Sequence, residues 1–307
     1  MTSLRVVFAL CLVCASSPVC AQALSAEQAA LIERGFTRAA ALPRLLGLVV
    51  SHAGVIVAER RFRGPKLDAP INIKSVSKSV ISALVGIAIS RGELQGTNQL
   101  IAPFFGKHLA QADPRTRQIT VGQLLTMQSG LTRTSGPAYG AWTSSRHWVA
   151  YVLTHPLLSD PGGPMIYSTG NTHLLSAILT QATGRSTQAY AREQLAKPLG
   201  ITLGPWPRDP QGIYVGGNDM HLSAHALVRF GELYRNHGRI GERQIVPEAW
   251  VRESWIPRTQ SIFSGQLYGY GWFIAELAGR RLYYAWGYGG QFVFIVPELA
   301  LTVVTTS

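Results

Sequence analysis

The chain has 307 residues, of which 47% are hydrophobic and only 14% charged, a balance that excludes a disordered segment. Its 31 glycines and 17 prolines are scattered rather than periodic, which excludes a collagen-like chain. The formal net charge is +12, but the basic residues are dispersed and no basic motif interleaved with aromatic residues accompanies them, so the sequence predicts no nucleic-acid partner.

Residues 1–23 have the pattern of a secretory signal peptide. Arg5 precedes a short apolar run, and small residues place the cleavage site after Ala21 or Ala23. An uncleaved membrane anchor is the alternative, but a Ser-Ser-Pro sequence interrupts an apolar run that is already too short to span a bilayer. We therefore expect a periplasmic or secreted protein with no stable membrane span after cleavage. The positive charge leaves association with anionic polymers of the cell envelope open.

All 3 cysteines lie within the predicted signal, so the mature chain would hold no disulfide and would depend on its hydrophobic core. Hydrophobic periods and turn residues predict the remaining elements. In chain order these are a helix over 26–42, strands over 45–50 and 55–59 joined by a turn at 52–54, helices over 77–91, 121–127, 148–153, 171–183, 187–195 and 223–236, and strands over 268–274, 281–286, 291–296 and 299–306.

This order of strands, helices and strands predicts an α+β fold with a single domain over 24–307. Residues 24–70 and 266–307 would form one antiparallel sheet flanked by helices. Residues 71–265 would form a large inserted helical part. A cleft between the two parts is where a functional site is expected.

Ser75 and Lys78 form the only Ser-x-x-Lys sequence in the chain. At helical spacing the two side chains share one face, so the lysine can reach the serine hydroxyl. The residues that follow are apolar around most of the helix, which predicts that the helix is buried. Burial and the positive helix end both favour the neutral amine, which could accept the serine proton. A helix N-cap with a solvated lysine is the alternative.

Tyr167 stands just before a second apolar helix. A tyrosine there can exchange protons with a nearby serine and lysine if the lysine lowers its pKa. Taken alone, a buried structural tyrosine is the alternative. No Gly-x-Ser-x-Gly, phosphate-loop or dinucleotide sequence occurs. His221 and His225 are four residues apart without a nearby carboxylate ligand, so we expect neither a metal nor an organic cofactor.

Together, Ser75, Lys78 and Tyr167 make the chain resemble the serine β-lactamase and penicillin-binding-protein superfamily, in its class C-like branch. It is most similar to serine hydrolases of the 6-aminohexanoate-dimer-hydrolase type. The segments 120–131, 216–220, 229–231, 269–272 and 287–291 also fit, so the resemblance runs from about Gly47 to the end. It implies that the serine is acylated, that the lysine and tyrosine share the base and acid roles, and that water or another acceptor resolves the acyl-enzyme.

The chain departs from this pattern at two motifs. Thr169 stands where the class C enzymes carry an asparagine two residues after the tyrosine, and Ala285 stands where a Lys or His begins the third motif. The resemblance then makes the backbone N–H groups of Ser75 and Tyr288 the oxyanion hole. Thr169, Trp286 and Gly287 are the expected substrate-binding residues, and an open pocket that includes Trp142 or Tyr139 would suit esters or linear amides.

The sequence given ends at Ser307, directly after a predicted strand. Relatives continue into a helix that covers one sheet face, so we expect this C-terminal helix to be missing, apolar sheet surface to be exposed, and stability to be lower than in longer relatives. The predicted function is an exported serine hydrolase that acts on a small-molecule ester or linear amide through an acyl-enzyme on Ser75. The alternatives are a D-amino-acid peptidase or β-lactamase, which Ala285 disfavours, and a catalytically silent envelope-binding protein.

Overall fold

The predicted antiparallel sheet is confirmed by the computed structural model, which describes residues 25–307; the predicted signal peptide and its cysteines lie outside the described residues. Eight strands follow the order β2-β1-β12-β11-β10-β9-β8-β7, so the first hairpin pairs with the last strand. The strands are β1 (Gly47–His52), β2 (Val55–Arg61), β7 (Thr259–Gln260), β8 (Leu267–Tyr268), β9 (Phe273–Leu277), β10 (Arg280–Gly287), β11 (Gln291–Val296) and β12 (Leu301–Thr306).

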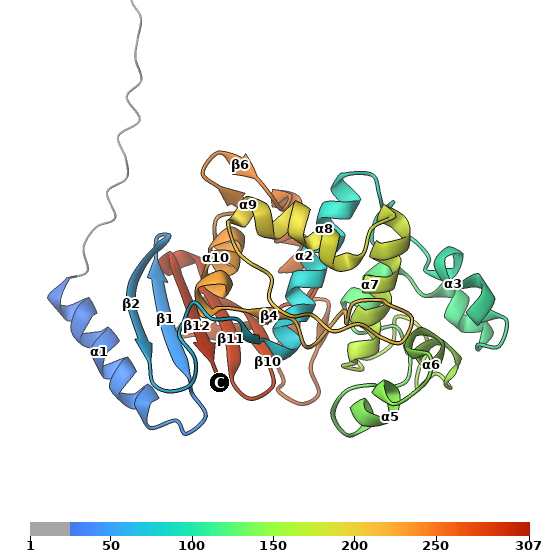
Figure 1. Ribbon diagram of the computed structural model, residues 1–307, viewed down its shortest axis with the longest axis horizontal. Coiled ribbons are helices and arrows are strands. Elements are labelled where there is room, and N and C mark those ends of the chain that lie inside the picture. Colours follow the sequence, from blue (N-terminus) through green and yellow to red (C-terminus); the bar gives the residue numbers. More distant parts are fainter. Residues whose placement is uncertain (1–24) are drawn as a thin grey trace, which may run out of the picture.

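The intervening chain forms a block of helices beside the sheet (Figure 1). The α-helices are α1 (Ala26–Ala40), α2 (Ser77–Ser90), α3 (Ala102–Leu109), α4 (Val121–Leu125), α5 (Tyr139–Thr143), α6 (Trp148–Thr154), α7 (Thr169–Thr183), α8 (Thr187–Ala191), α9 (Lys197–Leu199), α10 (Ala224–Arg235) and α11 (Glu248–Ser254). Short 3₁₀ turns are η1 (Lys74–Val76), η2 (Pro114–Gln118), η3 (Gly136–Ala138) and η5 (Pro297–Leu299), and a π turn is η4 (Arg192–Ala196). Two small hairpin-like sheets pair β3 (Ile71–Asn72) with β4 (His221–Leu222) and β5 (Arg239–Ile240) with β6 (Arg243–Gln244).

Alternation along the strands gives the large sheet two apolar faces. On β1, Val49 belongs to the main core, together with residues of α2 and α10. Its neighbours Leu48 and Val50 point to the opposite face, where they pack with Phe36 of α1. Within 25–307, none of the helices has the length and apolarity that crossing a bilayer requires.

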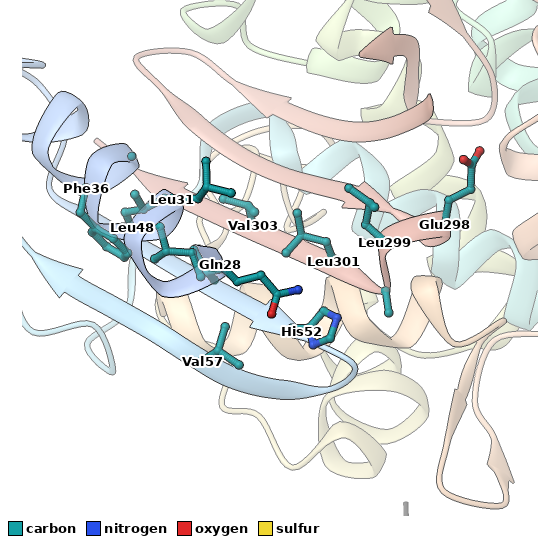
Figure 2. A pocket seen from close by; sticks show the side chains of 14 residues that line it. Gln28, Leu31, Phe36, Leu48, His52, Val57, Glu298, Leu299, Leu301 and Val303 are labelled. Atoms are coloured by element: carbon teal, nitrogen blue, oxygen red, sulfur yellow. The ribbon is translucent and has the colours of Figure 1, made fainter. Parts of the chain in front are cut away.

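The face under α1 carries an open apolar groove of about 710 Å³ (Figure 2). Leu31 of α1 and Leu299 of η5 are 51% and 43% exposed beside the groove, whereas Leu48 and Val50 of β1 are buried beneath it. Its lining residues include Leu31, Phe36, Leu48, Val57, Leu299, Leu301 and Val303, and none of the predicted site residues belongs to it.

Helix α2 lies at the centre of the main core, and residues 77–88 of it are all buried. Packing is so close that a Cβ at Gly86 would lie 2.2 Å from the ring of Trp250. The expected buried helix after Ser75 is thus confirmed, with an end at Ser90 rather than residue 91.

The strand predicted over 268–274 is wrong as a continuous strand, because the chain leaves the sheet between β8 and β9. Here the carbonyl oxygens of Tyr270 and Gly271 turn to α2 and accept hydrogen bonds from Ser82 (2.7 Å) and Ser79 (2.6 Å). These bonds satisfy buried hydroxyls that helix α2 carries into the core. The C-terminal sheet segment also begins earlier than the predicted residue 266, because β7 starts at Thr259.

Candidate active site

The start of α2 brings Ser75 and Lys78 together. Ser75 lies in the 3₁₀ turn η1, Lys78 follows in the first turn of α2, and the lysine Nζ donates a hydrogen bond to Ser75 Oγ at 2.9 Å. Ser75 is partly exposed, whereas Lys78 is 1% exposed. A partly exposed hydroxyl therefore contacts an amine that is shielded from solvent.

The backbone enters this turn in a strained conformation. Lys74, directly before Ser75, has φ of +52°, in the left-handed region that a residue with a Cβ seldom adopts. The side chain of Asn72 accepts a hydrogen bond from the Lys74 N–H at 2.9 Å and holds the turn in place. Such strain concentrates at functional sites, where surrounding contacts fix the position of a reactive group.

Lys78 makes two further hydrogen bonds. Its Nζ donates to the backbone carbonyl of Gly217 at 2.7 Å and to Thr169 Oγ1 at 3.2 Å. Burial lowers the pKa of Lys78 to about 7, and the negative charge of Asp219 opposes this shift. Near neutral pH, a large fraction of Lys78 is therefore the neutral amine, which can accept the proton of Ser75.

Tyr167 lies beside this pair. Its ring centroid is 5.0 Å from Lys78 Nζ, on the segment that leads into α7. Burial raises the pKa of Tyr167, and a hydrogen bond with the Ser75 side chain offsets only part of this rise. The condition set by the sequence for proton exchange, a tyrosine pKa lowered by the lysine, is not met, because burial raises this pKa. Tyr167 is thus a neutral phenol that can donate a proton, while Lys78 is the group able to accept one.

Thr169 opens α7 and is 3% exposed. Its hydroxyl lies 3.2 Å from Lys78 Nζ and 2.8 Å from Ser135 Oγ. Thr169, which replaces the asparagine of class C enzymes, therefore contacts the amine of Lys78. Its direct contact with substrate stays a prediction.

The C-terminal end of β10 lies beside η1, the turn that holds Ser75. A Cβ at Gly287 would lie 2.5 Å from the Ile73 carbonyl oxygen, so a glycine is required where the strand meets η1. Trp286 is 37% exposed, with its ring centroid 6.4 Å from that of Tyr167. Tyr288, 70% exposed, follows directly. The strand end thus runs beside the turn that holds Ser75, and the roles of Gly287, Trp286 and the Tyr288 N–H stay predictions.

Trp142 and Tyr139, the aromatic residues expected in the open pocket, lie in different surroundings. Trp142 is 0% exposed and packs against the rings of Trp148 and His173 inside the helical block, so its assignment to an open pocket is wrong. Tyr139 is only partly buried. Its hydroxyl donates to Asp219 Oδ2 at 2.9 Å and accepts from Asn218 Nδ2 at 3.0 Å.

Asp219 and the Gly217 carbonyl both act on Lys78, and neither was among the predicted site residues. Asp219 also accepts a hydrogen bond from Asn72 at 2.7 Å and lies 3.7 Å from Lys74 Nζ. The sequence feature that marks this segment is the adjacent pair Gly216 and Gly217. A Cβ at either position would lie 2.0 Å from an atom of Thr172. Two adjacent glycines indicate a close approach of backbone to another element, here α7, but the sequence does not say to which element.

His221 and His225, which are four residues apart in the sequence, contact different residues. His221 Nδ1 lies 3.1 Å from the backbone oxygen of Asp219, and His225 Nε2 lies 2.7 Å from a carboxylate oxygen of Glu59. In the described part of the chain, no group of three or more His, Cys, Asp or Glu side chains is arranged to hold a metal ion.

A serine, a desolvated lysine and a tyrosine at the junction of a helical block and an antiparallel sheet are the features of the superfamily that the sequence resembles. The family model described as Beta-lactamase matches residues 39–307. The chain belongs to the beta-lactamase family. That match includes every predicted catalytic residue and the whole of the large sheet.

Solved structures similar to this beta-lactamase-family chain show the same fold. A putative 6-aminohexanoate-dimer hydrolase from Bacillus anthracis has a TM-score of 0.73 at 20% identity, over 86% of this chain and 73% of that one. EstCE1, a hydrolase with promiscuous acyltransferase activity, has a TM-score of 0.73 at 18% identity, over 91% of this chain and 93% of that one. A penicillin-binding-protein homologue from Caulobacter crescentus gives 0.73 at 18% identity, over 90% of each chain.

Proposed function

We propose that this protein is an exported serine hydrolase that cleaves an ester or a linear amide through an acyl-enzyme on Ser75. The observation that carries the proposal is the 2.9 Å contact between the partly exposed Ser75 hydroxyl and the buried Lys78 amine, whose pKa lies at about 7. The hydrolases among the structural neighbours support the general class, and the pattern of residues 1–23 supports export.

In the acylation step, Ser75 Oγ attacks the substrate carbonyl carbon while its proton passes to Lys78 Nζ. The backbone N–H groups of Ser75 and Tyr288 would stabilise the oxyanion of the tetrahedral intermediate. Tyr167, kept neutral by burial, donates its proton to the leaving oxygen or nitrogen and regains one from the Lys78 ammonium. The carbon–heteroatom bond breaks, and the acyl group remains on Ser75.

Deacylation repeats these steps with water. Water attacks the acyl carbon, its proton passes to the same lysine–tyrosine pair, and Ser75 leaves protonated while the carboxylic acid is released. The partly exposed Ser75 and the adjoining exposed Trp286 are consistent with a site that is open to water and to small apolar acyl groups.

Ala285 favours ester or linear-amide substrates over β-lactams. It occupies the position at which related enzymes carry a cation, and it is 1% exposed, so no positive charge faces a substrate carboxylate from that position. A peptidase or β-lactamase function would therefore lose one charge-assisted hydrogen bond at the substrate.

A substrate panel tests the proposal. The protein without residues 1–23 would be assayed with p-nitrophenyl acetate and butyrate, a linear p-nitroanilide and a chromogenic cephalosporin. We expect ester or anilide turnover with kcat/KM at least about tenfold above that for the cephalosporin. Protein blocked beforehand with a fluorophosphonate is the matched control. Faster cephalosporin turnover would establish the β-lactamase alternative, and a folded protein that turns over none of these substrates would favour a silent binding protein.

A further inference from the structure

A histidine–aspartate pair is buried outside the catalytic group. His173 of α7 and Asp209 are joined by an Nε2–Oδ2 contact of 2.9 Å, and both side chains are fully buried. The rings of Trp142 and Trp148 pack against the imidazole with centroids 5.5 and 5.4 Å away. Burying two titratable side chains is costly unless they make good hydrogen bonds, so the pair calls for an explanation.

Asp209 organises the loop that follows it. Its Oδ1 accepts hydrogen bonds from the backbone N–H groups of Gln211 and Ile213, both at 2.8 Å. Its Oδ2 is occupied by His173. One carboxylate therefore ties the loop over residues 209–213 to helix α7.

His173 extends this connection to the glycine pair. Its Nδ1 accepts a hydrogen bond from the Gly216 N–H at 3.4 Å, which places the ring proton on Nε2, where it is donated to Asp209. Gly216 and Gly217 are seated directly on Thr172 of the same helix, because a Cβ on either would lie 2.0 Å from a Thr172 atom. The position of this backbone segment is thus set by α7.

The segment ends on the catalytic lysine. The Gly217 carbonyl oxygen accepts the 2.7 Å hydrogen bond from Lys78 Nζ, the shortest of the three that this amine donates. A continuous series of contacts therefore leads from Asp209 through His173 and Gly216 to Lys78.

We propose that His173 and Asp209 are positioning residues that hold the Gly217 carbonyl against Lys78 and so set the geometry and basicity of the catalytic amine. They touch neither Ser75 nor the substrate-facing wall at Trp286. The inference rests on the proposed function, because it assumes that Lys78 activates Ser75. No assignment from the sequence included either residue.

The other charged and titratable groups around Lys78 come from different elements. Tyr167 precedes α7, Ser75 lies in η1, and Asp219 acts on Lys78 through its charge from the loop before β4. The His173–Asp209 pair makes no hydrogen bond to any of these three groups. Its direct connection to Lys78 runs through Gly216 and Gly217, and helix α7, which also carries Thr169, is the second connection.

The sharpest variant is Asp209→Asn, which keeps the shape of the side chain. The new amide would donate to His173 Nε2 and so move the ring proton to Nδ1, where it would oppose the Gly216 N–H. We expect Gly217 to move away from Lys78. Because that carbonyl stabilises the ammonium form, the pH at which labelling of Ser75 by a fluorophosphonate is half-maximal should fall by about one unit. The plateau rate should fall about tenfold.

His173→Gln gives a second test, because the amide nitrogen takes the place of Nε2 and can donate to Asp209, while no acceptor atom is left where Nδ1 accepts from the Gly216 N–H. The same downward shift is expected. His173→Asn keeps an acceptor near Gly216 and should stay near the wild-type midpoint. Ser176→Ala is the matched control: it removes the 2.7 Å bond to the Tyr214 carbonyl of the same loop and should leave the midpoint unchanged. Circular dichroism establishes which variants are folded.

The outcomes separate the two proposals. A wild-type chain that does not label would refute the proposed function itself. A wild-type chain that labels, together with folded Asp209→Asn and His173→Gln variants that keep its midpoint, would overturn the positioning role alone. A lowered melting temperature with an unchanged midpoint would have the same meaning, since it would reveal a purely structural pair.

Discussion

Replacing Ser75 with alanine should reduce ester hydrolysis by about 10⁴-fold or more, because the substitution removes the only atom that can carry the acyl group. Ser75 is partly exposed and its hydroxyl is bonded to Lys78, not to a buried backbone group. The variant should therefore fold as the wild-type chain does. Initial rates with p-nitrophenyl acetate at pH 8 measure the loss.

Ser79→Ala is the matched control on the same helix. Ser79 donates to the buried Gly271 carbonyl at 2.6 Å, so its loss should lower the free energy of unfolding by about 1–3 kcal/mol while the folded protein keeps its activity. A Ser75→Ala variant that retained more than a small part of wild-type activity would show that another residue is the nucleophile.

Replacing Lys78 with methionine should lower kcat/KM by about 10³-fold. Methionine fills most of the same buried volume but provides no proton acceptor for Ser75. In the wild type, the pKa of about 7 means that the neutral amine is lost as pH falls, so kcat/KM should drop about tenfold between its plateau and pH 6. In Lys78→Met this decline below pH 7 should be absent.

The measurement is kcat/KM for one ester between pH 5 and 9, with Lys66→Met, a change at an exposed lysine, as the control. That control should reproduce the wild-type profile. If Lys78→Met retained both the rate and the decline in acid, the base would be another group and the assignment of Lys78 would be wrong.

Local spacing explains why the contact between Ser75 and Lys78 could be predicted. Ser75 and Lys78 are three residues apart at the start of one helix, so the contact follows from helical geometry alone. The strand periods at both chain ends likewise predicted one antiparallel sheet, in which β1 pairs with β12. These predictions depend on short-range patterns and on the need to bury one face of each element.

The groups that tune the lysine could not be predicted, because they come from distant parts of the chain. Gly217 and Asp219 reach Lys78 only after the loop before β4 is seated on α7. The raised pKa of Tyr167 could not be predicted for a related reason, because the sequence does not show how deeply this phenol is buried. Trp142 was placed in the pocket because an aromatic residue in a helical segment looks the same whether it faces the core or the cleft.

The pH dependence of fluorophosphonate labelling tests the central claim most directly. Intact mass and peptide mapping would follow the rate and the site of modification between pH 5 and 9. An Lys78-activated Ser75 predicts one adduct, located on Ser75, with a rate that rises with pH and is half-maximal near 7. No adduct on the folded protein, an adduct on another residue, or a rate that does not change through this range would contradict it.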